Sequence, residues 1–195
     1  MKTMKVEITL LDELLGTASA NPELHREYIA STSPDPGTIE EEVAAIGVDA
    51  AVEKSMTVFP RENGQPFFYD YQMKAFFKEA CGNLGRVPGT LSNKLKAHKK
   101  VISGTIFVQP RKMILNVNGK VGNCQRPLRA ETAQGPRIAL ANSESIPKGS
   151  TFAAEIVLLD EGHEKLVREW LDYGKLFGLG QWRNSGKGRF FWKEL

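Results

Sequence analysis

GKLFGLGQWRNSGKGRFFW, residues 174–192, is the stretch from which this sequence is best interpreted. Glycines alternate in it with cationic side chains, in the order Gly178, Gly180, Arg183, Gly186, Lys187, Gly188 and Arg189. Glycine permits positive φ and a close approach of the backbone to a ligand, while exposed amides and cationic side chains supply donors for phosphate oxygens. The segment therefore predicts a loop that binds a polyanion.

Two nucleotide-binding motifs do not fit this loop. Five residues separate Gly180 from Gly186-Lys187, where a P-loop has four, and Gly188 stands where the Mg-binding hydroxyl should follow. The dinucleotide fingerprint follows a strand, whereas this loop follows a segment with helical periodicity, and its third glycine is missing. Nucleotide hydrolysis and dinucleotide binding are therefore disfavoured.

Charge is distributed unevenly along the chain, although the net charge is only +3. No Asp or Glu occurs between Ala80 and Ala130. The cations of this basic middle segment are Arg86, Lys94, Lys96, Lys99, Lys100, Arg111, Lys112, Lys120, Arg126 and Arg129. A stretch of one sign attracts phosphate and accelerates encounter with nucleic acid. The alternative is a solvated basic face without a ligand.

Length and cysteine usage indicate one ordinary globular protein. A chain of 195 residues can build one substantial core without disulfides or metals. Cys81 and Cys124 have neither CxxC spacing nor histidine neighbours, so we expect two reduced, buried thiols and no metal or other cofactor. Glu7, Asp12 and Glu13 interrupt the apolar N-terminus, which predicts neither a signal peptide nor a membrane span. We expect a cytoplasmic protein without a membrane partner.

Periodicity predicts a mixture of strands and helices. Strands are expected over residues 5–11, 102–108, 113–117, 151–159 and 188–192, and helices over 23–29, 38–46, 70–82 or 70–85, and 161–177. Asn63-Gly64 predicts a hairpin turn between the runs SMTVF and PFFY. Residues 87–100 predict a mobile basic loop. The order of these elements favours an α+β sheet with helices on one face over a parallel doubly wound sheet.

Three blocks of the chain resemble the RAMP proteins of CRISPR systems. IPKGSTF (146–152), the strand and helix after it, and GLGQWRNSGKGRF (178–190) resemble their C-terminal half, where a glycine-rich loop closes a ferredoxin-like fold. PFFYDYQMKAFFKEACG (66–82) resembles the family segment I-P-G-S-S-L-K-G-A-L-R at the first core helix, with Lys74 at the matching lysine. Tyr69, Asp70 and Tyr71 depart from that pattern, because small residues stand there in the family. The predicted first strand, KVEITLL (5–11), also has the same position in the chain as the first strand of these proteins.

The resemblance implies both an architecture and a function. The architecture is a single RAMP-like domain over 1–195, with an RRM-like or ferredoxin-like antiparallel sheet, helices on one face, and insertions near 16–53 and 87–143. The function is non-catalytic binding of RNA, or another single-stranded nucleic acid, by shape and backbone charge. The implied partners are RNA, further copies of the chain or other ribonucleoprotein subunits. A stand-alone version from a phage or mobile element is one form of such a protein.

Particular residues follow from this interpretation. Phosphate contacts are expected from Arg183, Lys187, Arg189 and Lys74, and Trp182 either stacks on a base or packs in the core. The electrostatic track is extended by Lys94, Lys96, Lys99 and Lys100. In the alternative interpretation the loop has no ligand, and its glycines and cations only make a tight connection from a helix to a strand.

Other functions stay open at the level of sequence. An RNA endonuclease of the same superfamily would use His25 or Asp35, although a lone helical histidine is usually a surface residue and an aspartate between prolines usually belongs to a turn. No Ser-His-Asp or Cys-His arrangement can be inferred, so the sequence leans away from an enzyme. A protein that keeps the fold but binds another protein, as an inhibitor or assembly factor, is the third alternative.

Overall fold

The computed structural model of the chain describes residues 1–19, 56–132 and 135–195. The short helices expected at 23–29 and 38–46 lie outside these ranges, as do His25 and Asp35. For residues 128–132 and 135–140 the backbone alone is described.

The central sheet has four strands in the order β12-β1-β11-β7. They are β1 (Lys2–Leu10), β7 (Ile106–Gln109), β11 (Thr151–Leu158) and β12 (Phe190–Glu194), and all neighbours run antiparallel. The helices α3 (Asp70–Leu84) and α4 (His98–Thr105) connect β1 to β7, and α5 (Glu164–Phe177) connects β11 to β12. This α+β arrangement, as expected, is compatible with a ferredoxin-like fold.

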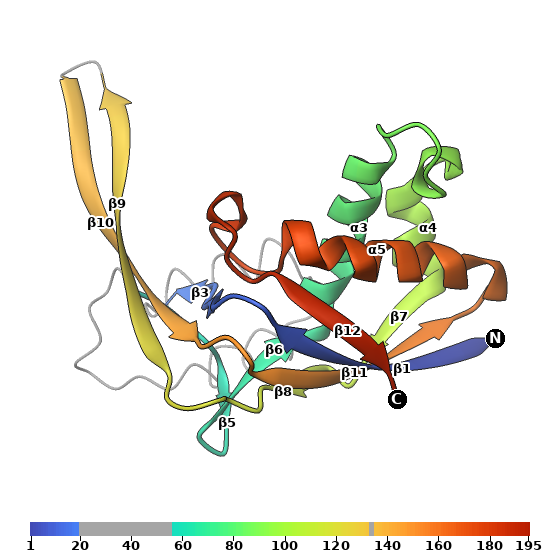
Figure 1. The fold of residues 1–195 in the computed structure, drawn as a ribbon, viewed down its shortest axis with the longest axis horizontal. Coiled ribbons are helices and arrows are strands. Elements are labelled where there is room, and N and C mark those ends of the chain that lie inside the picture. The colour runs from blue at the N-terminus through green and yellow to red at the C-terminus, as the bar shows by residue number, and fades with distance from the viewer. Residues whose placement is uncertain (20–55, 133–134) are drawn as a thin grey trace, which may run out of the picture.

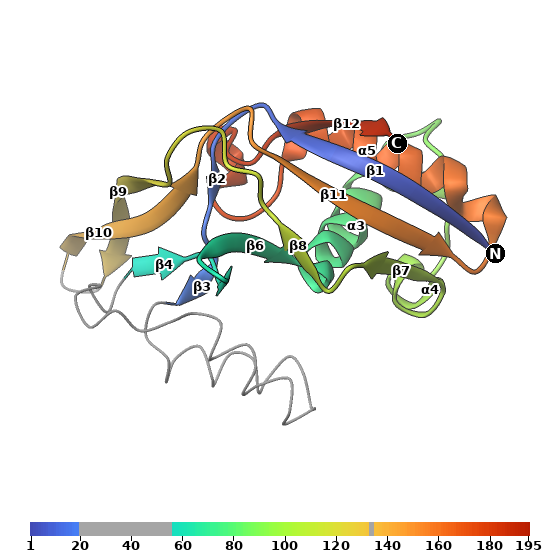
Figure 2. The same cartoon turned by 90° about the horizontal axis from the view of Figure 1, so that it is seen from below.

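One face of this sheet is covered by helices, as Figures 1 and 2 show. Alternate residues of β1, such as Met4, Val6 and Ile8, are fully buried, because successive strand side chains point to opposite faces. Helices α3 and α5 meet on that face, with the Phe77 and Trp170 ring centroids 5.7 Å apart. No helix in the described ranges is both long and apolar enough to cross a membrane.

Helix α3 and the hairpin before it follow the sequence pattern closely. Asn63 and Gly64 both have positive φ in the turn between β5 (Arg61–Glu62) and β6 (Gln65–Tyr69). The turn prediction is confirmed, although β5 rather than SMTVF supplies the partner strand. The helix begins at Asp70 and ends at Leu84, followed by Gly85 as its C-terminal cap. The predicted apolar stripe is buried and consists of Met73, Phe76, Phe77 and Ala80.

The segment 87–100 includes helical elements where the sequence predicts only a loop. It contains the 3-10 turn η1 (Ser92–Lys94) and begins α4 at His98, and the following strand starts at Ile106 instead of residue 102. The Glu169 carboxylate of α5 accepts hydrogen bonds from the Leu91 and Ser92 amides, at 2.7 and 3.0 Å. A distant acidic side chain thus fixes backbone that local propensity leaves undecided.

Two strands project from the body as a long hairpin, which we call the arm. They are β9 (Gly122–Thr132) and β10 (Gly135–Ile146), paired antiparallel along their length (Figure 1). At its base β10 pairs with β2 (Leu14–Leu15) and, in parallel, with β4 (Met56–Val58), which also pairs with β3 (Ala18–Ser19). A further short strand, β8 (Lys112–Ile114), pairs with β6. Residues 87–143 thus hold both most of the arm and β7 of the central sheet.

The two cysteines are in different environments. Cys81 lies buried on α3, where burial raises the pKa of its thiol above the ordinary value. Cys124 lies on the arm and is partly exposed, so the prediction of two buried thiols holds for Cys81 only. Neither forms a disulfide in the structure.

Candidate nucleic-acid interface

The glycine-rich loop, residues 178–189, is folded tightly on itself. The Leu179 amide donates a 2.9 Å hydrogen bond to the Gly188 carbonyl, which draws the two ends of the loop together. Gly178 and Gly188 both have positive φ, and a Cβ on Gly188 would lie 2.0 Å from the Leu179 carbonyl oxygen. The packing of the loop alone therefore requires glycine at these two positions. This packing agrees with the alternative in which the glycines make a tight connection from a helix to a strand.

Several polar groups of the loop bind the protein itself. The Gly188 amide donates to the Glu13 carbonyl at 2.8 Å, and the Arg189 carbonyl accepts from the Leu11 amide at 2.7 Å. The Gln181 side-chain amide donates to the carbonyl of Gly16. These contacts join the loop to the chain that follows β1, so fewer amides face solvent than the glycine content suggests.

The three loop cations form ion pairs with acidic side chains from distant parts of the sequence. Arg189 lies 2.7 Å from the Asp12 carboxylate, and Lys187 and Arg183 pair with Glu13 and Glu79 respectively. Three positive charges are thereby set against three negative charges. The pairing was invisible in the sequence, because the acids are more than a hundred residues away.

Trp182 lies at the surface of the loop and not in the core. Its side chain is 42% exposed and its backbone has a φ of 53°. The Arg126 guanidinium lies 5.0 Å from the ring centroid and the Lys187 ammonium 5.8 Å from it, both within cation–π range. Arg126 also donates to Gln181 at 3.0 Å, but its Nε and Nη1 lack a hydrogen-bond partner within the described residues. Arg126 thus carries unused donor capacity beside an exposed aromatic ring.

Lys74, the lysine that matches the family segment, is engaged within the protein. Its ammonium donates to the Ser103 carbonyl at 3.0 Å and lies 4.5 Å from the Phe107 ring centroid. Partial burial lowers the pKa of Lys74 below the ordinary lysine value. The side chain therefore connects α3 to α4 and β7.

Other cations line a surface hollow between α3 and α4, which we call the α3–α4 hollow. Its lining includes Lys78, Arg86, His98 and Lys99, together with Gly82 of α3. Three more exposed lysines are close to these residues in sequence: Lys94 in η1, Lys96 in the turn between η1 and α4, and Lys100 in α4. Within the part of the chain that the structure describes, none of these lysines or Arg86 has an acidic partner. Apart from Lys78, these cations all belong to the basic middle segment.

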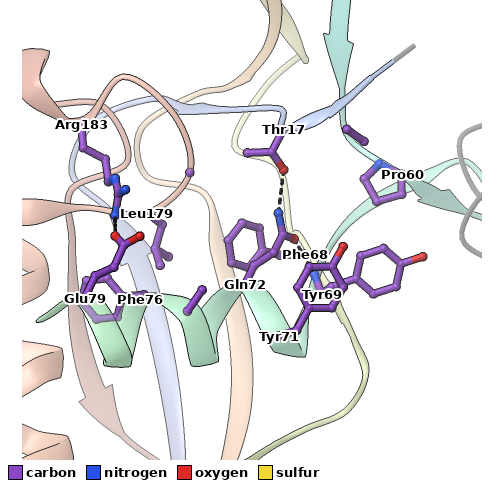
Figure 3. Close-up of a pocket in the computed structure, with 13 residues that line it drawn as sticks. Thr17, Pro60, Phe68, Tyr69, Tyr71, Gln72, Phe76, Glu79, Leu179 and Arg183 are labelled. Carbon is purple, nitrogen blue, oxygen red and sulfur yellow. Dashed lines mark hydrogen bonds and ion pairs between the residues drawn. The ribbon is translucent and has the colours of Figure 1, made fainter. Parts of the chain in front are cut away.

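A cavity of about 230 Å³ separates the start of α3 from the glycine-rich loop, and we call it the α3–loop pocket (Figure 3). Tyr69 and Tyr71 line it and stack on each other, with centroids 5.2 Å apart and rings inclined by 17°. These are two of the residues that depart from the family segment. Glu79 lines both this pocket and the α3–α4 hollow, so the two depressions adjoin along α3.

Asp70, the first residue of α3, is a partly buried carboxylate beside Arg111. Burial raises the pKa of Asp70 above its ordinary value, against the opposing effects of the Tyr71 amide and of Arg111, whose guanidinium lies 3.8 Å away. Among the described residues no group of three histidine, cysteine, aspartate or glutamate side chains could hold a metal ion.

No family model and no curated protein matches this chain in sequence. A chain of the cryo-EM structure of the Type III-B Cmr-beta bound to cognate target RNA superposes with a TM-score of 0.53 at 13% identity, over 98% of this chain and 59% of that one. A chain of a Type IV-B CRISPR complex gives a TM-score of 0.49 at 9% identity, over 100% of this chain and 90% of that one. The first likeness shows a shared fold, and this chain spans 59% of the length of that subunit.

Proposed function

We propose that this chain is a non-catalytic, RAMP-like RNA-binding protein that contacts the RNA backbone through the α3–α4 hollow. The observation that carries the proposal is a set of cations that have no acidic partner among the described residues. Lys78, which is partly buried, and the exposed Arg86 and Lys99 line the hollow, and the exposed Lys94, Lys96 and Lys100 lie in the adjoining sequence. The sequence predicted backbone contacts from both the glycine-rich loop and the basic middle segment, and the proposal keeps only the part of that segment around the hollow, together with Lys78.

Electrostatics favour the hollow over the loop. An unpaired cation releases counterions when it meets a phosphate, whereas a cation already bound to a carboxylate must first break that pair. The loop cations Arg183, Lys187 and Arg189 are in the second situation. The loop then serves to hold the end of α5 against β1 and to form one wall of the α3–loop pocket.

The fold supports the same proposal by analogy. The similar Type III-B chain belongs to an assembly bound to cognate target RNA. By that analogy this chain would act within a ribonucleoprotein, together with other subunits or further copies of itself, in the cytoplasm. Because one fold can carry different functions, the experiment below tests the residues of the site themselves.

The test is binding of a labelled single-stranded RNA across a salt series. The variant Lys78→Ala/Arg86→Ala/Lys99→Ala removes three lining cations of the hollow. Each lost phosphate contact reduces the slope of log K against log salt by roughly 0.7 for a single strand, so the triple variant should lower it by about 2. Its affinity at low salt should fall at least tenfold.

A charge-matched control separates the hollow from general electrostatics. Lys120, Lys148 and Lys165 are exposed lysines outside the hollow, so changing all three to alanine removes the same charge elsewhere. The control should keep most of the salt slope. Equal losses in the two variants, or a wild-type protein without salt-dependent RNA affinity, would contradict the proposal and direct the search to protein partners.

A further inference from the structure

The α3–loop pocket combines apolar walls with polar groups at set places. Figure 3 shows the Glu79–Arg183 ion pair at one end, Tyr69, Tyr71 and Pro60 at the other, and the Gln72–Thr17 hydrogen bond between them. Phe68, Phe76 and Leu179 are buried and line the interior. Sites for small organic ligands have this character: they are mostly apolar, with a few oriented polar groups.

The size of the pocket limits the ligand. Its volume of about 230 Å³ is below the roughly 300–1,000 Å³ that is usual for drug-sized ligands. It therefore suits one planar ring system better than a complete nucleotide. Tyr71, at the rim, is 38% exposed and stacks on Tyr69, which provides an aromatic surface of the kind on which bases stack.

We propose that the α3–loop pocket receives one nucleobase of the bound RNA, an inference that rests on the RNA-binding function proposed above. The base inserts between the apolar walls and the tyrosines. The Glu79 carboxylate accepts a hydrogen bond from an exocyclic amine, and the Arg183 guanidinium donates to a ring nitrogen or carbonyl oxygen, as these groups do at base edges elsewhere. The ion pair at this end is thus a recognition element for the edge of the base.

The position of the pocket relative to the α3–α4 hollow agrees with this assignment. Glu79 lines both depressions, and Arg183 lies 4.4 Å from the ring centroid of Phe177, which lines the hollow. A strand whose phosphates lie in the hollow therefore passes the mouth of the pocket. One base can enter it while the backbone stays on the cations.

Ala75 allows a test that leaves the core intact. It lines the pocket from the exposed side of α3, so Ala75→Leu fills the cavity with a good helix former, and Ala75→Ser is the matched control that keeps it open. The probes are a single-stranded RNA and the same RNA with abasic residues, which keeps every phosphate. Stacking in the pocket should give wild type and Ala75→Ser about a tenfold preference for the RNA with bases. Ala75→Leu should bind both probes equally, at the affinity of wild type for the abasic strand.

The outcomes separate the pocket from the RNA-binding function. Two outcomes overturn the base pocket and leave the proposed function standing. In the first, wild type binds both probes with equal, salt-dependent affinity. In the second, Ala75→Leu keeps the full preference for the RNA with bases. Absence of salt-dependent binding to either probe overturns the function and the pocket with it. If Ala75→Leu fails to fold, Tyr71→Ala repeats the test from the rim, and an unchanged preference there overturns the pocket.

Discussion

Individual glycines of the loop differ in how far the structure depends on them. Gly186 and Gly188 both have positive φ, at 85° and 71°. A Cβ on Gly188 would overlap the Leu179 carbonyl oxygen at 2.0 Å, whereas a Cβ on Gly186 would lie 3.4 Å from the flexible side chain of Arg189. Two positions with similar backbone conformation therefore have very different surroundings.

We expect Gly188→Ala to destabilise the protein far more than Gly186→Ala. Positive φ costs a residue with a Cβ about 1–2 kcal/mol in both variants, and only Gly188→Ala adds a backbone clash, for a total of roughly 3 kcal/mol or more. Urea unfolding of the two variants measures the difference. Similar losses in both would show that the loop backbone adjusts and that its close packing contributes little.

The ion pair between Asp12 and Arg189 leads to a prediction about RNA affinity. Its side chains are 36% and 42% exposed, so the pair contributes at most about 1 kcal/mol to stability. Asp12→Asn preserves the shape of the side chain and frees one cation. RNA affinity at low salt should therefore rise about two- to fivefold, and the gain should disappear at high salt.

Glu155→Gln is the matched control for this change. It removes the same negative charge and releases Lys5, which lies 2.9 Å from Glu155 in the central sheet. Lys5 is on neither the loop nor the hollow, so affinity should change little. If both variants gain affinity equally, net charge explains the effect and the loop cations have no particular role.

At the scale of elements, a single carboxylate on α5 anchors the basic segment. Glu169 binds the Leu91 and Ser92 amides, and the Ser92 hydroxyl accepts a 2.9 Å bond from the indole of buried Trp170. These contacts hold η1 against α5, next to Lys94 and Lys96. The order of the basic surface therefore depends on a helix more than 70 residues further along the chain.

We expect Glu169→Ala to loosen this segment without unfolding the core. Losing hydrogen bonds to a charged acceptor costs about 1.5–3 kcal/mol, and residues 91–94 should then exchange amide hydrogens faster while α3 keeps its protection. RNA affinity should fall at the same time, because the neighbouring lysines lose their fixed positions. Lys165→Ala, at an exposed position of α5, is the control and should leave exchange unchanged. Unchanged exchange over 91–94 in Glu169→Ala would show that other contacts hold η1.

At the scale of the whole molecule, the fold sorts the cations into two groups. Acids near the end of β1 and on α3 neutralise the cations of the glycine-rich loop. The cations of the basic middle segment that surround the α3–α4 hollow have no such partners in the described part of the chain. The net charge of +3 therefore understates the local positive potential of that surface.

Much of the fold could be predicted, because local pattern and tertiary contacts agree in the core. The stripes of α3 and α5 and the alternation in β1, β11 and β12 indicated these elements correctly to within a few residues. The secondary structure predicted for residues 87–105 was wrong in part. Its turn residues and lysines show little apolar periodicity, and its backbone is held by Glu169, which is distant in sequence. The candidate site was predicted only as a list of residue types, since the partners of its cations lie far away in sequence.

The sequence by itself determined the elements of the core, the α+β class and the concentration of positive charge in the middle of the chain, because these follow from periodicity and composition. Tertiary structure alone decided which cations are paired and which are unpaired. It also placed the Glu79–Arg183 ion pair and Tyr71 around one pocket. The physical reason is that an ion pair or a cavity depends on distances between segments that lie far apart in the chain, and no local pattern specifies those distances.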